Sequence, residues 1–273
     1  MAHIYMSTDS SGPMSWTRRC RQALRASRQS RNPLIRAAAG LLFAARETLR
    51  SAQTFLTNGT YRSVAVVRWF RPRALHQTTV LTWMDRYPQI FCACRDYFGQ
   101  RQNLRVLSFG CATGEEVITL RAYFPSAWIT GAEINRRSLA VCRARLVDDR
   151  TSFLYSTRGA IRAHGPFDAI FCMAVLQRTP HAVAGAGVAS LKAIYPFEKF
   201  EQQVSALDAM LRTGGLLIVH HTQYRVRDTA VGSHYTPLSV PDRPADRGPL
   251  FDRNSILIPD AMREGSIFVK HTS

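Results

Sequence analysis

The segment 106–116 constrains the fold of this 273-residue chain more than any other. An apolar run, Val-Leu-Ser-Phe, leads into Gly110-Cys-Ala112-Thr-Gly114 and then into two acidic residues. Small residues at this spacing let the backbone turn sharply from a strand into a helix and leave room for a ligand against the main chain. The segment therefore predicts a strand–turn–helix unit of a parallel α/β sheet, with a ligand at the turn.

The two acids, Glu115 and Glu116, indicate which ligands fit this turn. In a dinucleotide fingerprint the third glycine comes three residues after the second, and the pyrophosphate rests on the helix N-terminus. Here the spacing is two, and carboxylates in the first helical turn would repel a diphosphate but can pair with an ammonium group. S-adenosylmethionine (SAM) has an ammonium, a sulfonium and no phosphate. A tight turn followed by ordinary first-turn acids is the alternative that the spacing alone leaves open.

A second acid strengthens the case for a nucleoside. The run 128–135 resembles a short buried strand that ends in Glu133, 23 positions after Gly110. In sheets of this class such an acid arrives beside the first loop and can accept hydrogen bonds from both ribose hydroxyls. The alternative for Glu133 alone is an acid at a helix N-terminus, but together the two features favour a nucleoside ligand.

Strand and helix signals alternate regularly beyond residue 77. Apolar runs separated by amphipathic segments predict a parallel sheet covered on both faces, with right-handed crossovers. We expect 213–215 to cap the last long helix through its glycines, and 266–270 to add an antiparallel strand. The expected strands lie near 105–109, 128–132, 151–155, 168–173 and 216–220, and the expected helices near 114–123, 135–146 and 197–212.

The run 104–212 resembles a class I SAM-dependent methyltransferase, and its motifs are most similar to the CheR-type branch, the chemotaxis-receptor methyltransferases. The first loop of that branch is similar to 111–116, and its Leu-Thr-x-Phe-Phe-Arg motif is similar to 81–86. The segments 167–176 and 211–221 resemble its fourth strand and its fifth-strand hairpin. The resemblance implies a Rossmann-like doubly wound, mainly parallel seven-stranded sheet, and SAM as the cofactor.

Roles for single residues follow from the same resemblance. Arg86 would bind the methionine carboxylate, Glu115 or Glu116 the amino group, and Glu133 the ribose. The other residues that the matched motifs place at the cofactor are Thr82, Gly110, Ala112, Gly114, Ala174 and Val175.

Two departures limit what the resemblance implies. Ser108 replaces the acid that many SAM enzymes keep just before the first glycine. Ala174 stands where the chemotaxis enzymes have an asparagine whose amide contacts the cofactor. The resemblance therefore supports cofactor binding better than it supports a receptor-glutamate acceptor.

Histidines near the ends of two strands are candidate catalytic bases. His221 is the first choice, because the related hairpin places a histidine there, with His181 second and Tyr224 third. A histidine that removes a proton from the acceptor contributes about 10²–10⁴ in rate. We predict no metal site, because His220 and His221 should point to opposite faces of a strand. The segment 179–195 is expected to form a lid over the pocket.

The N-terminal region, residues 1–78, is predicted to be basic and largely helical, before a SAM-binding domain at 79–273. Residues 1–79 carry thirteen arginines and two acids, which is +11 of the total charge of +17. This surplus suits nucleic acid, an anionic membrane surface or an acidic protein. The apolar stretch between Arg36 and Arg46 is too short for a bilayer, which takes about 20 residues. The six cysteines lack paired zinc spacings and indicate reduced thiols and a cytoplasmic location, with membrane-surface contact as a further possibility.

These features together predict a methyltransferase that acts on a hydroxyl of a small molecule or glycan. One alternative is a CheR-like enzyme that esterifies protein glutamates, whose acidic target would suit the basic N-terminal region. The other alternative is a nucleic-acid or membrane-surface binding module with a vestigial SAM pocket, consistent with the charge and with Ser108.

Overall fold

A computed structural model describes residues 32–145, 148–240 and 248–271. The chain divides into two compact units, residues 1–62 and 63–273. The boundary predicted at residue 79 lies inside the larger unit. The cysteine at position 20 and six of the thirteen arginines of the N-terminal region fall outside the described residues.

Among the described residues of the smaller unit is a long helix, α2 (Pro33–Thr57). Asn32 caps its start, where the side-chain oxygen accepts the backbone N–H of Leu34 at 2.9 Å. A second helix, α3 (Gly59–Phe70), follows after Asn58. In the ranges that the structure describes, no helix combines the length and the apolar character needed to cross a bilayer.

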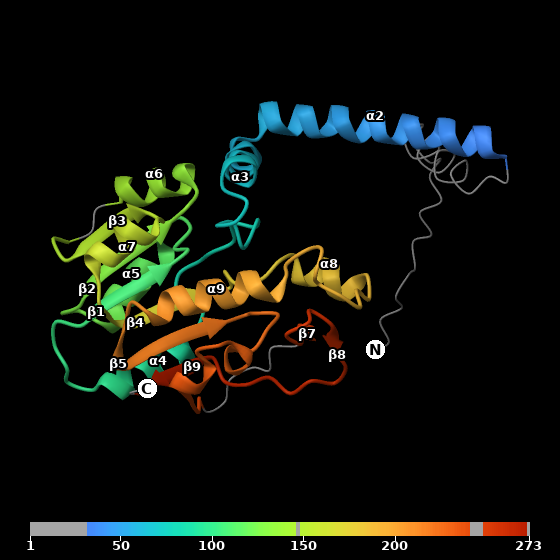
Figure 1. Cartoon of the computed structure of the whole chain (residues 1–273). Coiled ribbons are helices and arrows are strands. Elements are labelled where there is room, and N and C mark those ends of the chain that lie inside the picture. The colour runs from blue at the N-terminus through green and yellow to red at the C-terminus, as the bar shows by residue number, and fades with distance from the viewer. Residues whose placement is uncertain (1–31, 146–147, 241–247, 272–273) are drawn as a thin grey trace, which may run out of the picture. The chain divides into compact units, whose positions relative to one another are not determined.

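The larger unit is built on a seven-stranded sheet, which confirms the predicted fold class (Figure 1). Its strands are β1 (Arg105–Phe109), β2 (Trp128–Glu133), β3 (Thr151–Tyr155), β4 (Phe167–Met173), β5 (Leu211–His220), β6 (Tyr235–Leu238) and β9 (Ile267–Lys270). They lie in the order β3-β2-β1-β4-β5-β9-β6. The first five strands are mutually parallel, whereas β9 runs antiparallel between β5 and β6. The antiparallel strand was predicted, but the short proline-containing β6 was not.

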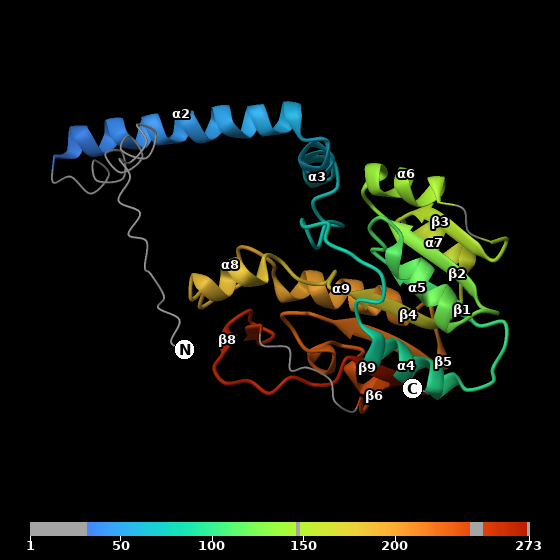
Figure 2. The ribbon, with the colours of Figure 1, turned by 180° about the vertical axis from the view of Figure 1, so that it is seen from behind.

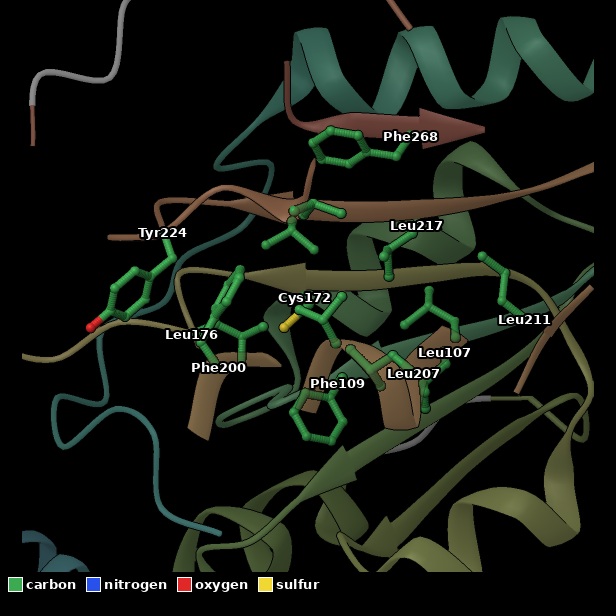
Figure 3. Close-up of a cluster of buried hydrophobic side chains, with 14 of the residues drawn as sticks. Leu107, Phe109, Cys172, Leu176, Phe200, Leu207, Leu211, Leu217, Tyr224 and Phe268 are labelled. Carbon is green, nitrogen blue, oxygen red and sulfur yellow. The ribbon is translucent and has the colours of Figure 1, made fainter. Parts of the chain in front are cut away.

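Helices cover both faces of this sheet, as Figures 1 and 2 show. One buried cluster joins α4 (Pro88–Phe98), α5 (Glu115–Tyr123) and α6 (Arg136–Ala144) to the sheet. The other joins α7 (Arg158–His164), α8 (Pro180–Gly185) and α9 (Phe197–Asp208). Figure 3 shows the second cluster, in which Leu107, Cys172 and Leu217 from three neighbouring strands meet Leu207 from α9. Both sheet faces are thus buried, as the near-continuous apolar strands require.

The end of α9 differs from the prediction. The helix stops at Asp208, and 213–215 lie inside β5 instead of capping the helix. Leu211 already pairs with Phe167, after which the register between β4 and β5 shifts. A side chain at Gly215 would come within 2.8 Å of the carbonyl oxygens of Arg212 and Asp168. Glycine is therefore needed here for a close approach of two strands, not for a helix C-cap.

The chain between β5 and β9 folds into several short elements at one end of the sheet. It contains the 3-10 turns η1 (Val226–Asp228) and η2 (Gly232–His234) and a small hairpin of β7 (Leu250–Phe251) with β8 (Leu257–Ile258). The sequence predicts only irregular, proline-rich loops in this region, because two-residue strands leave no periodic signal.

Candidate active site

A cavity opens at the carboxyl ends of β1, β2 and β4. Residues 109–112, 133–135 and 173–175, which follow these three strands, line it. The strand order reverses between β1 and β4, and ligands of doubly wound sheets bind at this point. The fold therefore brings three of the four predicted motifs to one cavity.

The glycine turn after β1 has the geometry that its sequence predicts. Gly110, Ala112 and Gly114 all adopt positive φ angles, of 78°, 50° and 94°. A Cβ atom at residue 110 would lie 2.6 Å from a methyl carbon of Val175, so the loops after β1 and β4 interlock. Gly114 does not line the cavity; it precedes α5 in the left-handed conformation and packs near Cys142.

Glu133 is held in place by the backbone of two loops. Its Oε2 accepts the Ala112 N–H at 2.9 Å, and its Oε1 accepts the Asn135 N–H at 2.7 Å. The side chain is buried yet lines the cavity, and burial raises the pKa of its carboxyl group. Because each oxygen can accept more than one hydrogen bond, the oriented carboxylate can still accept bonds from two ligand hydroxyls.

The structure separates the roles of the two acids at the start of α5. Glu116 lines the cavity and accepts the Ser108 hydroxyl at 2.7 Å. Burial raises its pKa to about 7, against the opposing effects of the Ser108 hydrogen bond and the charge of Arg86. Glu115 forms an ion pair with Arg145 and does not line the cavity. Of the two predicted partners for an amino group, only Glu116 is placed to bind a ligand.

Ser108 belongs to this arrangement, although its sequence position suggests a weakened site. The buried serine lies at the position of the acid expected just before the first glycine. Its hydroxyl donates to Glu116, whose carboxylate reaches the cavity from the neighbouring helix. Sequence reasoning missed this pairing because the two residues are eight positions apart and belong to different elements.

Arg86 and Thr82 precede the first strand, and the resemblance implies that they contact the cofactor. Both line the cavity. The Arg86 guanidinium donates to the Leu81 carbonyl at 2.8 Å and stacks over the Trp83 ring, with 4.2 Å between its central carbon and the ring centroid. These contacts hold the cation at the cavity without a carboxylate partner among the ion pairs of the described residues.

Residues from 64–80, upstream of the predicted motif at 81–86, also line the cavity, which the sequence does not predict. Two cations hold this segment: Arg178 and Lys199 donate to the carbonyl oxygen of Leu75, at 2.6 and 2.8 Å. Burial, followed by the charge of Arg178, lowers the Lys199 pKa to about 8. The segment 179–195, which was expected to be the lid, contributes no residue to this cavity.

His76 is a cavity residue that sequence reasoning missed. It is buried, and its Nδ1 lies 2.7 Å from the hydroxyl of Tyr195. Burial, followed by the charge of Lys199, lowers its pKa to about 3, so the imidazole is neutral. No pattern in the sequence distinguishes this histidine, because its partners are more than 100 residues away.

Ala174 and Val175 both line the cavity, at the end of β4. Ala174 has a φ of 58°, and its N–H donates to the His220 carbonyl at 2.8 Å. The alanine therefore presents only backbone and a methyl group to the ligand, as its substitution for asparagine implies.

The two predicted catalytic histidines line a second cavity. His181 and His221 line it, together with Arg86, which also borders the first cavity. The prediction that His220 and His221 point to opposite faces is wrong, because their ring centroids are only 4.0 Å apart. The strand ends at His220, and a positive φ of 52° at His221 turns its ring back onto its neighbour. Among the described residues, no group of three His, Cys, Asp or Glu side chains is placed to hold a metal ion.

Tyr224, the third candidate base, is a core residue. It is fully buried in the cluster of Figure 3, and its hydroxyl donates to the Tyr195 carbonyl at 2.6 Å. It also lies 3.0 Å from the Ser255 hydroxyl, and burial raises its pKa to about 12. The aromatic side chain lines neither of these two cavities, so the assignment of Tyr224 as a base is corrected to a structural role.

The thiols near the glycine turn are free. The sulfur atoms of Cys111 and Cys142 are 4.0 Å apart, and both side chains are buried. Cys142 also donates to the Ala112 carbonyl at 3.1 Å, which ties α6 to the turn.

Comparisons with known proteins give distant similarities. No protein-family model matches the chain. An uncharacterized protein of a Synechococcus species is 34% identical over 100 residues, which are 35% of this chain and 24% of that protein. The chain therefore spans about a quarter of that curated relative.

Solved structures of methyltransferases are similar at low identity. The plantazolicin methyltransferase BpumL in complex with SAH is 12% identical, with 61% of this chain and 55% of that chain covered and a TM-score of 0.36. The amino pentose methyltransferase CalS10 of Micromonospora echinaspora, bound to SAM, is 21% identical, with 59% and 57% covered and a TM-score of 0.37. The chain spans little more than half the length of these proteins.

Proposed function

We propose that this protein is a SAM-dependent methyltransferase. The observation that carries the proposal is the placement of Glu116 and Glu133 on one cavity at the switch point of the sheet. Glu133 is fixed by two backbone N–H groups, and Glu116 by Ser108. Carboxylates in the first turn of α5 exclude a phosphate there and suit a cationic ligand.

Three polar groups of SAM each have a residue that fits them. Glu133 would accept the ribose hydroxyls, Glu116 would pair with the amino group, and Arg86 would bind the carboxylate. When bound, SAM supplies a methyl group on a reactive sulfonium. The main task of the protein is then to hold the acceptor in line with it, and positioning of this kind contributes up to roughly 7–11 kcal/mol.

The acceptor that we propose is a hydroxyl of a small molecule or glycan, bound in the second cavity. His181 and His221 line this cavity, and Arg86 borders both cavities. A histidine there can remove the hydroxyl proton as the methyl group moves. His221 is the preferred base, because it lies at the carboxyl end of β5, beside the end of β4.

A CheR-like protein carboxyl methyltransferase is the second candidate. It is favoured by the motifs around Arg86 and Glu116, whereas Ala174 offers no side-chain amide to the cofactor. The product distinguishes the two reactions, since methyl esters release methanol in base and methyl ethers do not. Incubation with methyl-labelled SAM and fractionated cell extract, followed by base treatment of the product, decides between them.

Calorimetry on the purified full chain tests the cofactor assignment. We expect SAM and its demethylated product, S-adenosylhomocysteine, to bind at one site, and Glu133→Gln to weaken binding about 10-fold or more, the range for hydrogen bonds to a charged group. Glu115→Gln is the matched control, because that carboxylate is a near neighbour outside the cavity. Absence of heat with both ligands would overturn the proposal, and so would equal losses in the two variants.

A further inference from the structure

We propose that α2 binds the surface of an anionic lipid bilayer through one apolar face. Five leucines of this helix are highly exposed within the smaller unit: Leu34 (78%), Leu41 (73%), Leu42 (63%), Leu49 (72%) and Leu56 (73%). At about 100° per residue they fall, with Ile35, within an arc of about 120°. We call these six residues the leucine face. A continuous apolar face of this size is costly to leave in water.

The charges on the rest of α2 suit an anionic partner. Arg36, Arg46 and Arg50 lie outside the leucine face, and Glu47 is the single acid of the helix. Residues 1–62 carry ten arginines and two acids in all. Apolar residues on one side and arginines on the other are typical of helices that lie in a membrane interface, where the arginines meet lipid phosphates.

A second copy of the chain fits this face less well. Ile35, Leu42, Leu49 and Leu56 do follow a seven-residue repeat, which a coiled coil would bury. The narrow seam of a two-stranded coil would, however, leave Leu34 and Leu41 beside it in water. A second copy would also bring a second set of arginines to the same surface without matching acids.

The helix is expected to lie along the bilayer surface, not to cross it. It is 25 residues long, but Arg36, Arg46, Glu47 and Arg50 all fall within it. Charged residues at such spacing are costly in the hydrocarbon core, whereas a helix in the interface keeps them in the headgroup layer.

Flotation of the full chain with lipid vesicles tests this proposal. The vesicles contain phosphatidylcholine alone, or phosphatidylcholine and phosphatidylglycerol in equal amounts. We expect binding to the anionic vesicles, with weakening as salt is raised, and little binding to the neutral ones. Arg46→Gln and Arg50→Gln should each reduce the binding constant about fivefold.

A matched pair of neutral double variants separates the leucine face from the rest of the helix. Leu42→Gln with Leu49→Gln should reduce vesicle binding about 100-fold, because two large apolar side chains no longer enter the interface. Thr54→Gln with Thr57→Gln alters the other side of α2 and should leave binding unchanged. Circular dichroism shows whether both variants keep their helix content.

Three outcomes would overturn the proposal: no binding to anionic vesicles, equal effects of the two double variants, or a dimer in sedimentation that the leucine pair abolishes without any vesicle binding. The last outcome would assign the face to a second copy. Vesicle binding is measured without SAM, and SAM binding without vesicles, so that failure of this inference and failure of the proposed enzyme activity are distinguishable.

Discussion

The two cavities of the larger unit are built in different ways. Around the cofactor cavity, Glu133 is fixed by backbone N–H groups from two loops, and the glycine turn that supplies one of them is interlocked with Val175. Around the second cavity, His221 follows the last residue of a strand, and its ring is placed by a positive φ and by stacking on His220. The backbone hydrogen bonds to Glu133 come from short local sequence motifs. The stacking of His221 on His220, in contrast, depends on where β5 ends. The residues of the cofactor cavity are therefore easier to predict from the sequence than those of the second cavity.

The largest effect is expected on the acceptor side. His221→Ala should lower kcat about 10²–10⁴-fold if the imidazole removes the acceptor proton. The SAM affinity measured by calorimetry should stay unchanged, because His221 does not line the cofactor cavity. An unchanged kcat with the identified acceptor would remove His221 as the base and leave His181, which lines the same cavity.

Glu133→Ala, unlike His221→Ala, should act mainly on SAM affinity. It removes two ligand hydrogen bonds and the acceptor for the Ala112 and Asn135 N–H groups, so we expect SAM binding to fall about 10²–10³-fold. Competition with labelled S-adenosylhomocysteine measures the loss. If Glu133→Ala bound SAM normally but lowered kcat, the roles of the cofactor cavity and the second cavity would not be separable.

Gly110→Ala tests the interlock between the two loops. The new methyl group would meet Val175, and alanine would have to adopt a φ of 78°, so we expect a loss of about 2–4 kcal/mol in the free energy of unfolding. Adding Val175→Ala should restore the part that is due to the clash, but not the part that is due to the backbone. Urea denaturation of the single and double variants measures both contributions to the free energy of unfolding. If the double variant lost as much stability as Gly110→Ala alone, the interlock would be refuted.

Glu116 should give SAM binding a pH dependence. Its carboxyl group has a pKa of about 7 in the cofactor-free protein, and only the ionised form attracts an ammonium group. Affinity should therefore fall as pH drops below about 7, by up to about tenfold per pH unit. The stability of the cofactor-free protein should run the other way and decrease as pH rises from about 4.5 to about 7, because the folded state holds this proton more tightly than the unfolded state does. Glu116→Gln should flatten both profiles, as calorimetry and thermal melts can show.

Tyr224→Phe should have the smallest effect. Loss of the hydroxyl leaves the Tyr195 carbonyl without this donor and should cost about 1–2 kcal/mol of stability, seen as a lower urea midpoint. Both kcat and SAM affinity should be unchanged. A marked loss of turnover at full stability would return Tyr224 to the list of candidate bases.

The cofactor side could be predicted from local sequence for physical reasons. A turn that needs glycine at positive φ and an acid at the end of the next strand are short-range features, and the structure brings Gly110, Ala112 and Glu133 together as expected. The same local reasoning could not choose between Glu115 and Glu116. Adjacent helical residues point about 100° apart, and the choice depends on contacts with Arg145 and Ser108 from elsewhere in the chain.

Long-range packing explains most of the features that could not be predicted from the sequence. The lining residues from 64–80 are held through Leu75 by Arg178 and Lys199, which lie over 100 positions after Leu75 in the chain. Tyr224 belongs to the core because Tyr195 and Ser255 meet its hydroxyl, and no periodicity connects these three residues. The early end of α9 likewise follows from the pairing of Leu211 with Phe167 in β4.

The pairing of Ser108 with Glu116 has a wider consequence for recognising such proteins. A negative charge usually sought at the tip of the first strand is delivered here from the first turn of the following helix, while a hydroxyl at the original position steadies it. In either arrangement the ligand would meet a carboxyl group at this point. Searches that require an acid at the strand position would pass over chains of this kind, whereas a search for any carboxylate that reaches that point in space would find them.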